Sequence, residues 1–398
     1  MTIRAALHRT LAAVAASSAV VALTACGTAP EPPAPVRIGA TMSQSGAYAT
    51  QGVPARDGYL LCAEHVNDAG GLFGRPIEFV IHDDESDGDT AAALYEQLIT
   101  DESVDAIMGP YGSTLTEAVA PVTERHRMVH ISPLAATTSI WEQGRRYLFM
   151  VLPPAELFLA GLIDLADERD LERVAVLAED QLFPRAAADG AVELARERGM
   201  TVVAAERYPS GQEDFLAFLK QAADGDAQVL AVAASALDDF INIMRQMREA
   251  GMDVSMFGTS GAVDEFRDAL GADAEYAYGL SAWEPAAPNP GADDFVDAYV
   301  EAFGRRPSFH AAGAYGSCQI LVEAAREAGT LDADALREVL LSLETTTVFG
   351  PWAVDARGYQ TAHRGLFIQW QDGERVIVWP DDVATAAPRY PTPRWDER

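Results

Sequence analysis

Short apolar segments alternate with helix-forming segments along most of this sequence, and that alternation limits the possible folds more than any other feature. Strands are expected at residues 36–40, 76–82 and 104–108, with helices at 56–67 and 90–100 between them. Parallel strands need a long crossover connection, which a helix usually supplies. The pattern therefore predicts an α/β fold with a parallel sheet covered on both faces.

A second series of the same kind follows a change of character near residues 147–154. About 370 residues lie beyond the N-terminal segment, which is more than one hydrophobic core usually serves, so two domains are expected. Residues 347–371 are predicted to form hairpin strands, and residues 384–398 a C-terminal tail along the surface. The strands of the second series are expected at 174–178, 201–205, 229–234 and 256–259.

The N-terminus has the features of a targeting segment. Basic residues precede an apolar stretch, 11–21, that is too short to span a membrane, so residues 1–25 are predicted to be a signal peptide. The ending Leu23-Thr-Ala-Cys26 resembles a bacterial lipobox, which would make Cys26 the lipidated first residue of the mature protein. The alternative is a chance cysteine in a plain signal peptide. Proline-rich residues 26–35 would then form a tether, and the protein would be extracytoplasmic and anchored to the membrane by lipid.

The sequence is strongly acidic, with a formal net charge of −31 and a single lysine, Lys220. Nucleic acids and anionic membrane surfaces would be repelled, so neither is expected as a partner, and the membrane would be contacted through the lipid anchor only.

Two further cysteines, Cys62 and Cys318, each share a helical stripe with apolar residues. Both thiols are therefore expected to point into a core. An oxidising location permits a disulfide, but their separation in space cannot be deduced from sequence. Two buried thiols are favoured over a bridge.

Motifs for catalysis, cofactors and metals are missing. There is no glycine-rich phosphate loop, the histidines lack metal-ligand spacing, and Ser260 does not lie in a nucleophile elbow. The acidic run at 82–89 lacks the alternating spacing of a calcium loop. We therefore expect no enzyme activity, no cofactor and no metal.

Hydroxyl residues follow two neighbouring predicted strands. Ser113 and Thr114 are expected at the N-cap of a helix that begins soon after strand 104–108, and Ser132-Pro133 ends strand 128–131. A helix N-terminus offers unpaired N–H groups and a partial positive charge, so a hydroxyl beside it can seat a ligand carboxylate. Ordinary helix capping is the alternative interpretation.

Four stretches together resemble one family, the type I solute-binding proteins of branched-chain amino acid (Leu/Ile/Val-binding) ABC transporters. The similarity runs from about residue 36 to 380. The stretches are Val36-Arg-Ile-Gly-Ala-Thr-Met-Ser-Gln-Ser-Gly46, Val66-Asn-Asp-Ala-Gly-Gly-Leu-Phe-Gly-Arg-Pro76, Ile131-Ser-Pro-Leu-Ala-Ala-Thr137 and Val348-Phe-Gly-Pro351.

This resemblance implies two doubly wound, Rossmann-like lobes joined by three hinge crossovers, near residues 151, 280 and 350. Lobe 1 would comprise 36–152 and 281–350, and lobe 2 would comprise 153–280 and 351–383. The implied protein is a monomer that captures a small carboxylate-bearing solute between its lobes and delivers it to ABC permease subunits. A ligand-sensing receptor that feeds a signalling partner is the alternative.

The resemblance also implies ligand-binding positions. The serine that meets the ligand carboxylate is Ser113, and the first loop would supply a lid. The family's threonine after Ser-Pro aligns with Ala136, so whether Thr137 supplies that hydroxyl is open. The implied positions are Tyr48, Gln51, Ser113, Leu134, Ala135, Ala136, Thr137, Phe183, Ser235 and Ser260.

Departures from the family's pattern concern the half of the site that holds an ammonium group. Phe183 replaces a tyrosine, an aromatic position is small at Ser235 or Ala236, and the acidic residue becomes Ser260. A buried ammonium without a carboxylate partner loses about 1.5–3 kcal/mol or more. We therefore expect a ligand with a carboxylate or amide but no α-amine, such as a larger or aromatic acid. The alternative is an amino acid whose ammonium pairs with one of three nearby acids, Asp180, Asp238 or Asp264.

Overall fold

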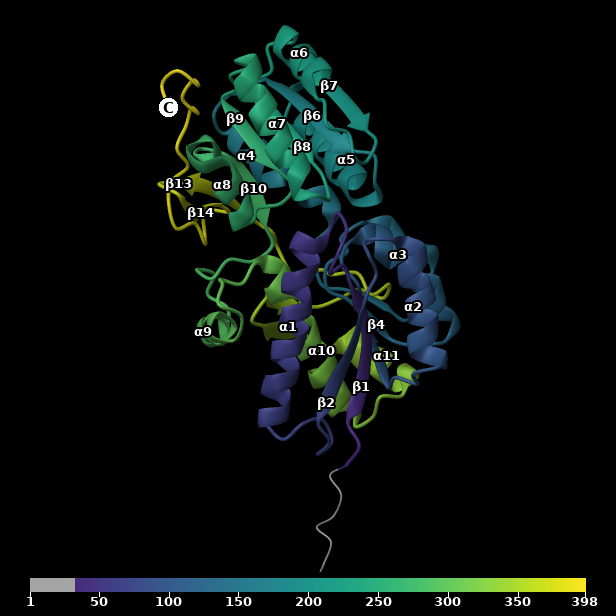
Figure 1. Ribbon diagram of the computed structural model, residues 1–398. Helices are drawn as coiled ribbons and strands as arrows, with labels where there is room; N and C mark the ends of the chain where they lie inside the picture. Colours follow the sequence, from purple (N-terminus) through teal and green to yellow (C-terminus); the bar gives the residue numbers. More distant parts are fainter. Residues whose placement is uncertain (1–32) are drawn as a thin grey trace, which may run out of the picture. The chain divides into compact units, whose positions relative to one another are not determined.

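The computed structural model describes residues 33–398. The predicted signal peptide, its Cys26 lipidation site and most of the predicted tether lie outside the described residues. Residues 34–398 form one unit that contains two open sheets, each with its own flanking helices (Figure 1). The prediction of two doubly wound α/β lobes joined by three crossovers is confirmed.

The first sheet has five parallel strands in the order β2-β1-β3-β4-β5. Helices α2 and α3 close a separate apolar cluster over β3, whereas α1 belongs to the main core on the opposite side (Figure 1). The elements are β1 (Val36–Met42), α1 (Ala49–Asp68), β2 (Ile77–Asp83), α2 (Gly88–Thr100), β3 (Ala106–Met108), α3 (Ser113–Arg125), β4 (His130–Ser132), the 3₁₀ helix η1 (Thr138–Gln143) and β5 (Leu148–Met150).

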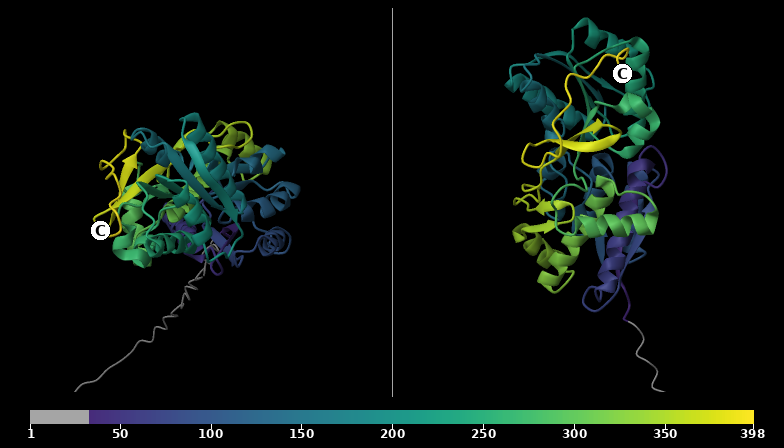
Figure 2. Two further views of the ribbon diagram at one scale, coloured as in Figure 1. Left: turned by 90° about the horizontal axis from the view of Figure 1, so that it is seen from above. Right: turned by 90° about the vertical axis from the view of Figure 1, so that its left-hand side faces the viewer.

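The second sheet has seven strands in the order β14-β13-β10-β9-β8-β6-β7. Strands β6 to β10 run parallel, while the hairpin β13–β14 adds two antiparallel strands at one edge, drawn in yellow in Figure 2. The elements are η2 (Ala155–Leu157), α4 (Ala160–Asp167), β6 (Arg173–Glu179), α5 (Leu182–Glu197), β7 (Thr201–Tyr208), α6 (Leu216–Asp224), β8 (Val229–Ala233), α7 (Leu237–Ala250), β9 (Met256–Thr259), α8 (Asp264–Leu270), η3 (Gly271–Ala274), β10 (Tyr278–Ser281), β13 (Leu366–Gln371) and β14 (Glu374–Trp379).

The chain leaves the first sheet after β5, returns to its helical layer after β10, and joins the second sheet again at β13. The returning segment places α10 against α1 and adds a small antiparallel pair, β11–β12. Helix α11 was not predicted from the sequence. The elements of this segment are α9 (Ala292–Phe303), α10 (Phe309–Ala328), α11 (Ala333–Ser342), β11 (Thr345–Thr347) and β12 (Gly350–Trp352).

Helix α1 begins at Ala49, although the sequence suggested a loop up to residue 52 and a helix from 56. Gly52 and Pro54 caused that error, because both usually mark a break. Gly52 instead permits close contact with the preceding loop: an added Cβ would lie 2.0 Å from the carbonyl oxygen of Ser43. The longer helix fixes Gln51 on its first turn.

Cys62 on α1 and Cys318 on α10 form a disulfide, so the prediction of two buried thiols was wrong. Their Cα atoms lie 6.4 Å apart. Close packing of the two helices brings them together, and Gly58 is essential to it, since a Cβ there would lie 2.2 Å from the carbonyl oxygen of Ala311. The two cysteines are 256 residues apart in the sequence, so local sequence patterns cannot predict that they are close in space.

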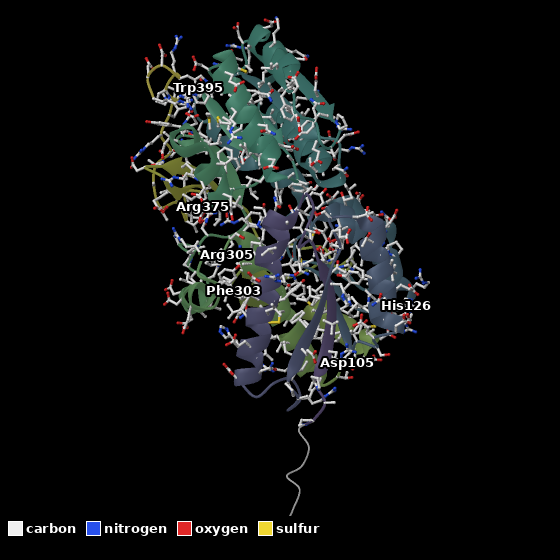
Figure 3. All side chains as sticks on the ribbon, in the orientation of Figure 1. Asp105, His126, Phe303, Arg305, Arg375 and Trp395 are labelled. Atoms are coloured by element: carbon white, nitrogen blue, oxygen red, sulfur yellow. A yellow bond between two sulfur atoms is a disulfide. The ribbon has the colours of Figure 1, made fainter. Side chains whose placement is uncertain are left out.

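The C-terminal tail lies against the lobe of the seven-stranded sheet. The indole N–H of Trp395 donates to the carbonyl oxygen of Met252 at 2.8 Å, and the N–H of Thr392 donates to that of Ser255 at 3.1 Å. Figure 3 shows Trp395 beside this lobe. The tail therefore braces the approach to β9.

Candidate functional site

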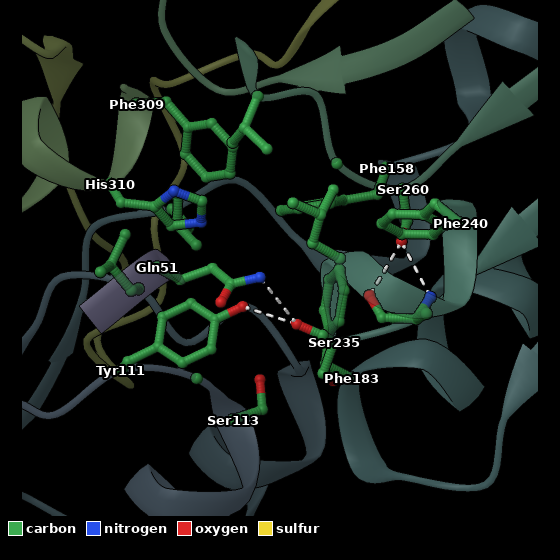
Figure 4. Close-up of a pocket in the computed structure, with 17 residues that line it drawn as sticks. Gln51, Tyr111, Ser113, Phe158, Phe183, Ser235, Phe240, Ser260, Phe309 and His310 are labelled. Atoms are coloured by element: carbon green, nitrogen blue, oxygen red, sulfur yellow. Dashed lines mark hydrogen bonds between the residues drawn. The ribbon is translucent and has the colours of Figure 1, made fainter. Parts of the chain in front are cut away.

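A cavity lies where the carboxyl ends of the strands of both sheets meet (Figure 4). Open α/β sheets usually bind ligands at this edge. Its apolar wall consists of Leu134, Leu152, Phe158, Phe183, Leu237, Phe240, Val263 and Phe309. Its polar groups come from Gln51, Tyr111, Ser113, Ser235, Ser260 and His310, and Gly112, Ala234 and Gly261 complete the lining.

Ser113 lies at the N-terminus of α3, where the chain turns directly from β3 into a helix. The helix begins at Ser113 itself, and Gly112, with φ +79°, takes the N-cap position, so the predicted side-chain cap is not formed. The Ser113 hydroxyl oxygen instead accepts the N–H groups of Ala136 at 3.1 Å and Thr137 at 3.2 Å. Its hydroxyl hydrogen has no acceptor among residues 33–398 and is available to a ligand.

The first-turn N–H groups of α3 are also unpaired among residues 33–398, and of the three residues concerned Ser113 lines the cavity. Those of Ser113, Thr114 and Leu115 have no acceptor within the described chain, and the first backbone bond of the turn is from Thr116 to Gly112. Because these groups accompany the positive end of the helix, an anion is favoured beside Ser113.

The turn after β4 contributes less than the sequence suggested. Leu134 lines the cavity, but Ala135, Ala136 and Thr137 are buried behind it. The backbone N–H groups of Ala136 and Thr137 hold the Ser113 hydroxyl rather than face the cavity. Tyr48 also lies outside the lining and packs against Tyr111, with ring centroids 5.4 Å apart.

One backbone carbonyl of the seven-stranded lobe accepts hydrogen bonds from two side chains of the opposite lobe. The backbone oxygen of Ser235, just beyond β8, accepts the side-chain N–H of Gln51 and the hydroxyl of Tyr111, both at 3.3 Å. Dashed lines mark both bonds in Figure 4. The two lobes are thus joined directly over the cavity.

The Ser235 peptide is oriented by a buried acid. Glu179, at the end of β6, accepts the N–H of Ser235 at 3.0 Å and the hydroxyl of Ser210 at 2.5 Å. A second buried acid, Asp239, accepts the hydroxyl of Tyr208 at 2.8 Å, and burial raises its pKa to about 6. Neither acid lines the cavity.

The cavity lining carries no formal charge among the described residues. His310 is 4% exposed, and burial lowers its pKa to about 3, so its imidazole is neutral at neutral pH. The three acids that could have paired with an ammonium lie elsewhere: Asp180 pairs with Arg185, Asp264 pairs with Arg375, and Asp238 is exposed.

Sequence reasoning placed Gln51, Ser113, Leu134, Phe183, Ser235 and Ser260 at positions that line the cavity. It missed the aromatic residues around them and His310. Tyr111 lies two residues before Ser113, between the predicted strand 104–108 and the helix that follows it, and could have been included. Phe309 and His310 begin α10, some 200 residues further on, and no local signal links them to the site.

No group of three or more His, Cys, Asp or Glu side chains in the described part of the chain is arranged to hold a metal ion. Among residues 33–398, no helix has both the length and the apolar character that crossing a membrane requires.

Known proteins resemble this chain along most of its length. The family described as "Periplasmic binding protein" matches residues 35–375. The Leu/Ile/Val-binding protein homolog 7 of Brucella suis is 26% identical over 394 residues, covering 93% of this chain and 98% of the relative.

Solved structures agree in fold. The branched-chain amino acid transporter substrate binding protein LivJ from Streptococcus pneumoniae, in complex with isoleucine, has a TM-score of 0.77 and 26% identity, covering 86% of this chain and 97% of that one. A solute binding protein of an ABC transporter from Rhodopseudomonas palustris, in complex with 3,4-dihydroxy benzoic acid, has a TM-score of 0.75 and 24% identity, covering 85% and 94%.

Proposed function

Since this chain belongs to the periplasmic binding protein family, we propose that it is the extracytoplasmic solute-binding component of an ABC importer. Family membership itself implies a binding protein with an extracytoplasmic location. The proposal adds a permease as partner, lipid anchoring through Cys26, and the lobe limits 36–152 with 281–350 and 153–280 with 351–383. We propose no catalytic role for the cavity.

The proposed ligand is a small carboxylic acid with an apolar body and no α-amine. One observation carries this proposal: the cavity offers an anion seat at Ser113 and the start of α3, yet no charged side chain of residues 33–398 lines it. The carboxylate would accept the Ser113 hydroxyl and first-turn N–H groups. The aromatic and aliphatic wall would enclose the rest of the molecule.

An α-amino acid fits this lining less well. Its ammonium would lie in a cavity where Ser260 stands in place of an acid, and Ser260 is already bonded to the Ala234 backbone at 3.2 and 3.3 Å. Glu179, which does not line the cavity, already accepts the Ser235 N–H and the Ser210 hydroxyl. Burying the ammonium without a charged partner would cost roughly several kcal/mol of binding free energy.

Mass spectrometry of the metabolite released by denaturing the purified protein tests the proposed ligand class. We expect a carboxylic acid without an amine. Titrations with benzoate and leucine, followed by thermal shift, give an independent comparison, since a ligand that binds only the folded state raises its stability. A released amino acid, or stabilisation by leucine alone, would contradict the proposed ligand class.

Substituting Ser113 with alanine is expected to weaken benzoate binding about 10- to 100-fold, because a charge-assisted hydrogen bond contributes about 1.5–3 kcal/mol. Ser132→Ala is the matched control: Ser132 is equally buried at the end of β4 but does not line the cavity. Isothermal titration of both variants measures the difference. Equal affinities in the two variants would place the carboxylate elsewhere.

A further inference from the structure

Two polar atoms of the cavity wall lack hydrogen-bond partners. The side-chain oxygen of Gln51 is fully enclosed and accepts no hydrogen bond within residues 33–398, although Gln51 is only 5% exposed. The Nε2 atom of His310 has no partner in the same part of the chain, and its Nδ1 atom has only a long contact of 3.5 Å to the Ser308 hydroxyl. Buried polar groups are normally paired, so the Gln51 oxygen calls for an explanation. The His310 Nε2 atom is unpaired within this range but not fully enclosed, so a ligand can reach it.

Several other polar groups of the wall are already engaged, whereas the hydroxyl hydrogen of Ser113 and the hydroxyl of Ser235 have no partner within residues 33–398. The Gln51 amide nitrogen and the Tyr111 hydroxyl both donate to the Ser235 oxygen, and Ser260 is bonded to Ala234. Rotating the Gln51 amide would not help, because its nitrogen is the atom that reaches Ser235. The unmet capacity around Gln51 therefore comprises one acceptor on Gln51, one imidazole nitrogen on His310 and the Ser235 hydroxyl.

Figure 4 shows that His310 and Ser113 lie at opposite ends of this wall, with Gln51 and Tyr111 between them. The facing wall is aromatic, and Phe158 and Phe183 pack edge to face with centroids 4.9 Å apart. A planar ring between these walls would direct one substituent toward Ser113 and the opposite one toward His310.

The group that meets Gln51 must donate a hydrogen bond, and the uncharged surroundings favour a neutral one. A hydroxyl both donates and accepts, so it satisfies the Gln51 oxygen and, at the same time, an imidazole N–H of His310. We propose, building on the function proposed above, that the ligand is a hydroxylated aromatic acid whose phenolic hydroxyl binds Gln51 and His310 while its carboxylate binds at Ser113.

Isothermal titration with benzoate, 4-hydroxybenzoate and 2-hydroxybenzoate tests this assignment. Neutral hydrogen bonds contribute about 0.5–1.5 kcal/mol each, so we expect 4-hydroxybenzoate to bind about tenfold more tightly than benzoate. In 2-hydroxybenzoate the hydroxyl adjoins the carboxylate and cannot reach His310, so its affinity should match that of benzoate.

The double variant Gln51→Leu/His310→Phe is expected to reduce the tenfold preference for 4-hydroxybenzoate to about one. The ratio is the appropriate measure, because the loss of the Gln51–Ser235 bond weakens closure on every ligand alike. The matched controls are Gln97→Leu on α2 and His126→Phe just beyond α3. Neither residue lines the cavity, so both variants should keep the preference for 4-hydroxybenzoate.

The outcomes separate this inference from the function on which it rests. Equal binding of benzoate and 4-hydroxybenzoate by the natural protein, or a preference that survives in the double variant, overturns the assignment of Gln51 and His310 and leaves an amine-free acid as the ligand. Binding of leucine, with no binding of any of the three acids, overturns the proposed ligand class as well.

Discussion

Replacing Ser260 with aspartate is expected to reverse the ligand preference of this protein. Benzoate should bind at least about 100-fold more weakly, because no cation among residues 33–398 lines the cavity to offset a second carboxylate, and an uncompensated buried charge costs about 3–5 kcal/mol. Leucine should gain affinity, since its ammonium would acquire a carboxylate partner. Ser260 is 2% exposed, so solvent does little to screen the new charge.

Ser260→Asn is the control for this reversal, because it is close in size to aspartate but carries no charge. Titrations at pH 8 are preferable, since burial raises the pKa of a carboxyl group and the aspartate must be ionised to act. The proposal that an ammonium partner is missing would be abandoned if Ser260→Asp left both ligands unaffected, or if Asn and Asp behaved alike.

Removing the disulfide is expected to lower the free energy of unfolding by about 3–5 kcal/mol. The bridge closes a loop of 256 residues, and the chain-entropy estimate for a loop of that length is about 5 kcal/mol. The double substitution Cys62→Ala/Cys318→Ala should therefore lower the melting temperature by several degrees. Denaturant unfolding, with and without reductant, measures the change.

Reductant supplies the internal control for the disulfide. It should destabilise the natural protein to about the level of the double variant and leave the double variant unchanged. If two free thiols were titrated in the denatured, unreduced protein and reductant had no effect on its stability, the bridge would not exist in solution.

The ends of the strands were the most predictable part of the site. Ser113, Ser235 and Ser260 follow strands whose apolar runs are evident in the sequence, and the ends of parallel strands gather at one edge of a sheet. Their location at the cavity follows from topology alone. The hydrogen bonds of each side chain cannot be deduced from topology. Ser113, for example, bonds to a turn 23 residues away.

Features that depend on packing between distant segments were not predictable. Pairing of Cys62 with Cys318 requires the crossing of α1 over α10, and the start of α1 depends on how Gly52 fits against the loop after β1. The entry of His310 into the cavity depends on the same helix pair. Local periodicity reports only which face of a helix is apolar and is silent about the neighbour that covers it.

The contact to the Ser235 carbonyl affects how well a partner that recognises the closed conformation can distinguish the ligand-bound protein from the ligand-free one. Both donors from the opposite lobe belong to the protein itself, so part of the free energy of closure is intrinsic to the chain. Apparent affinity scales with the share of molecules already in the binding-competent form, so this contact strengthens capture at low solute concentration. The same contact also raises the fraction of ligand-free molecules that are closed. Affinity is therefore increased, while the difference in conformation between ligand-free and ligand-bound populations becomes smaller.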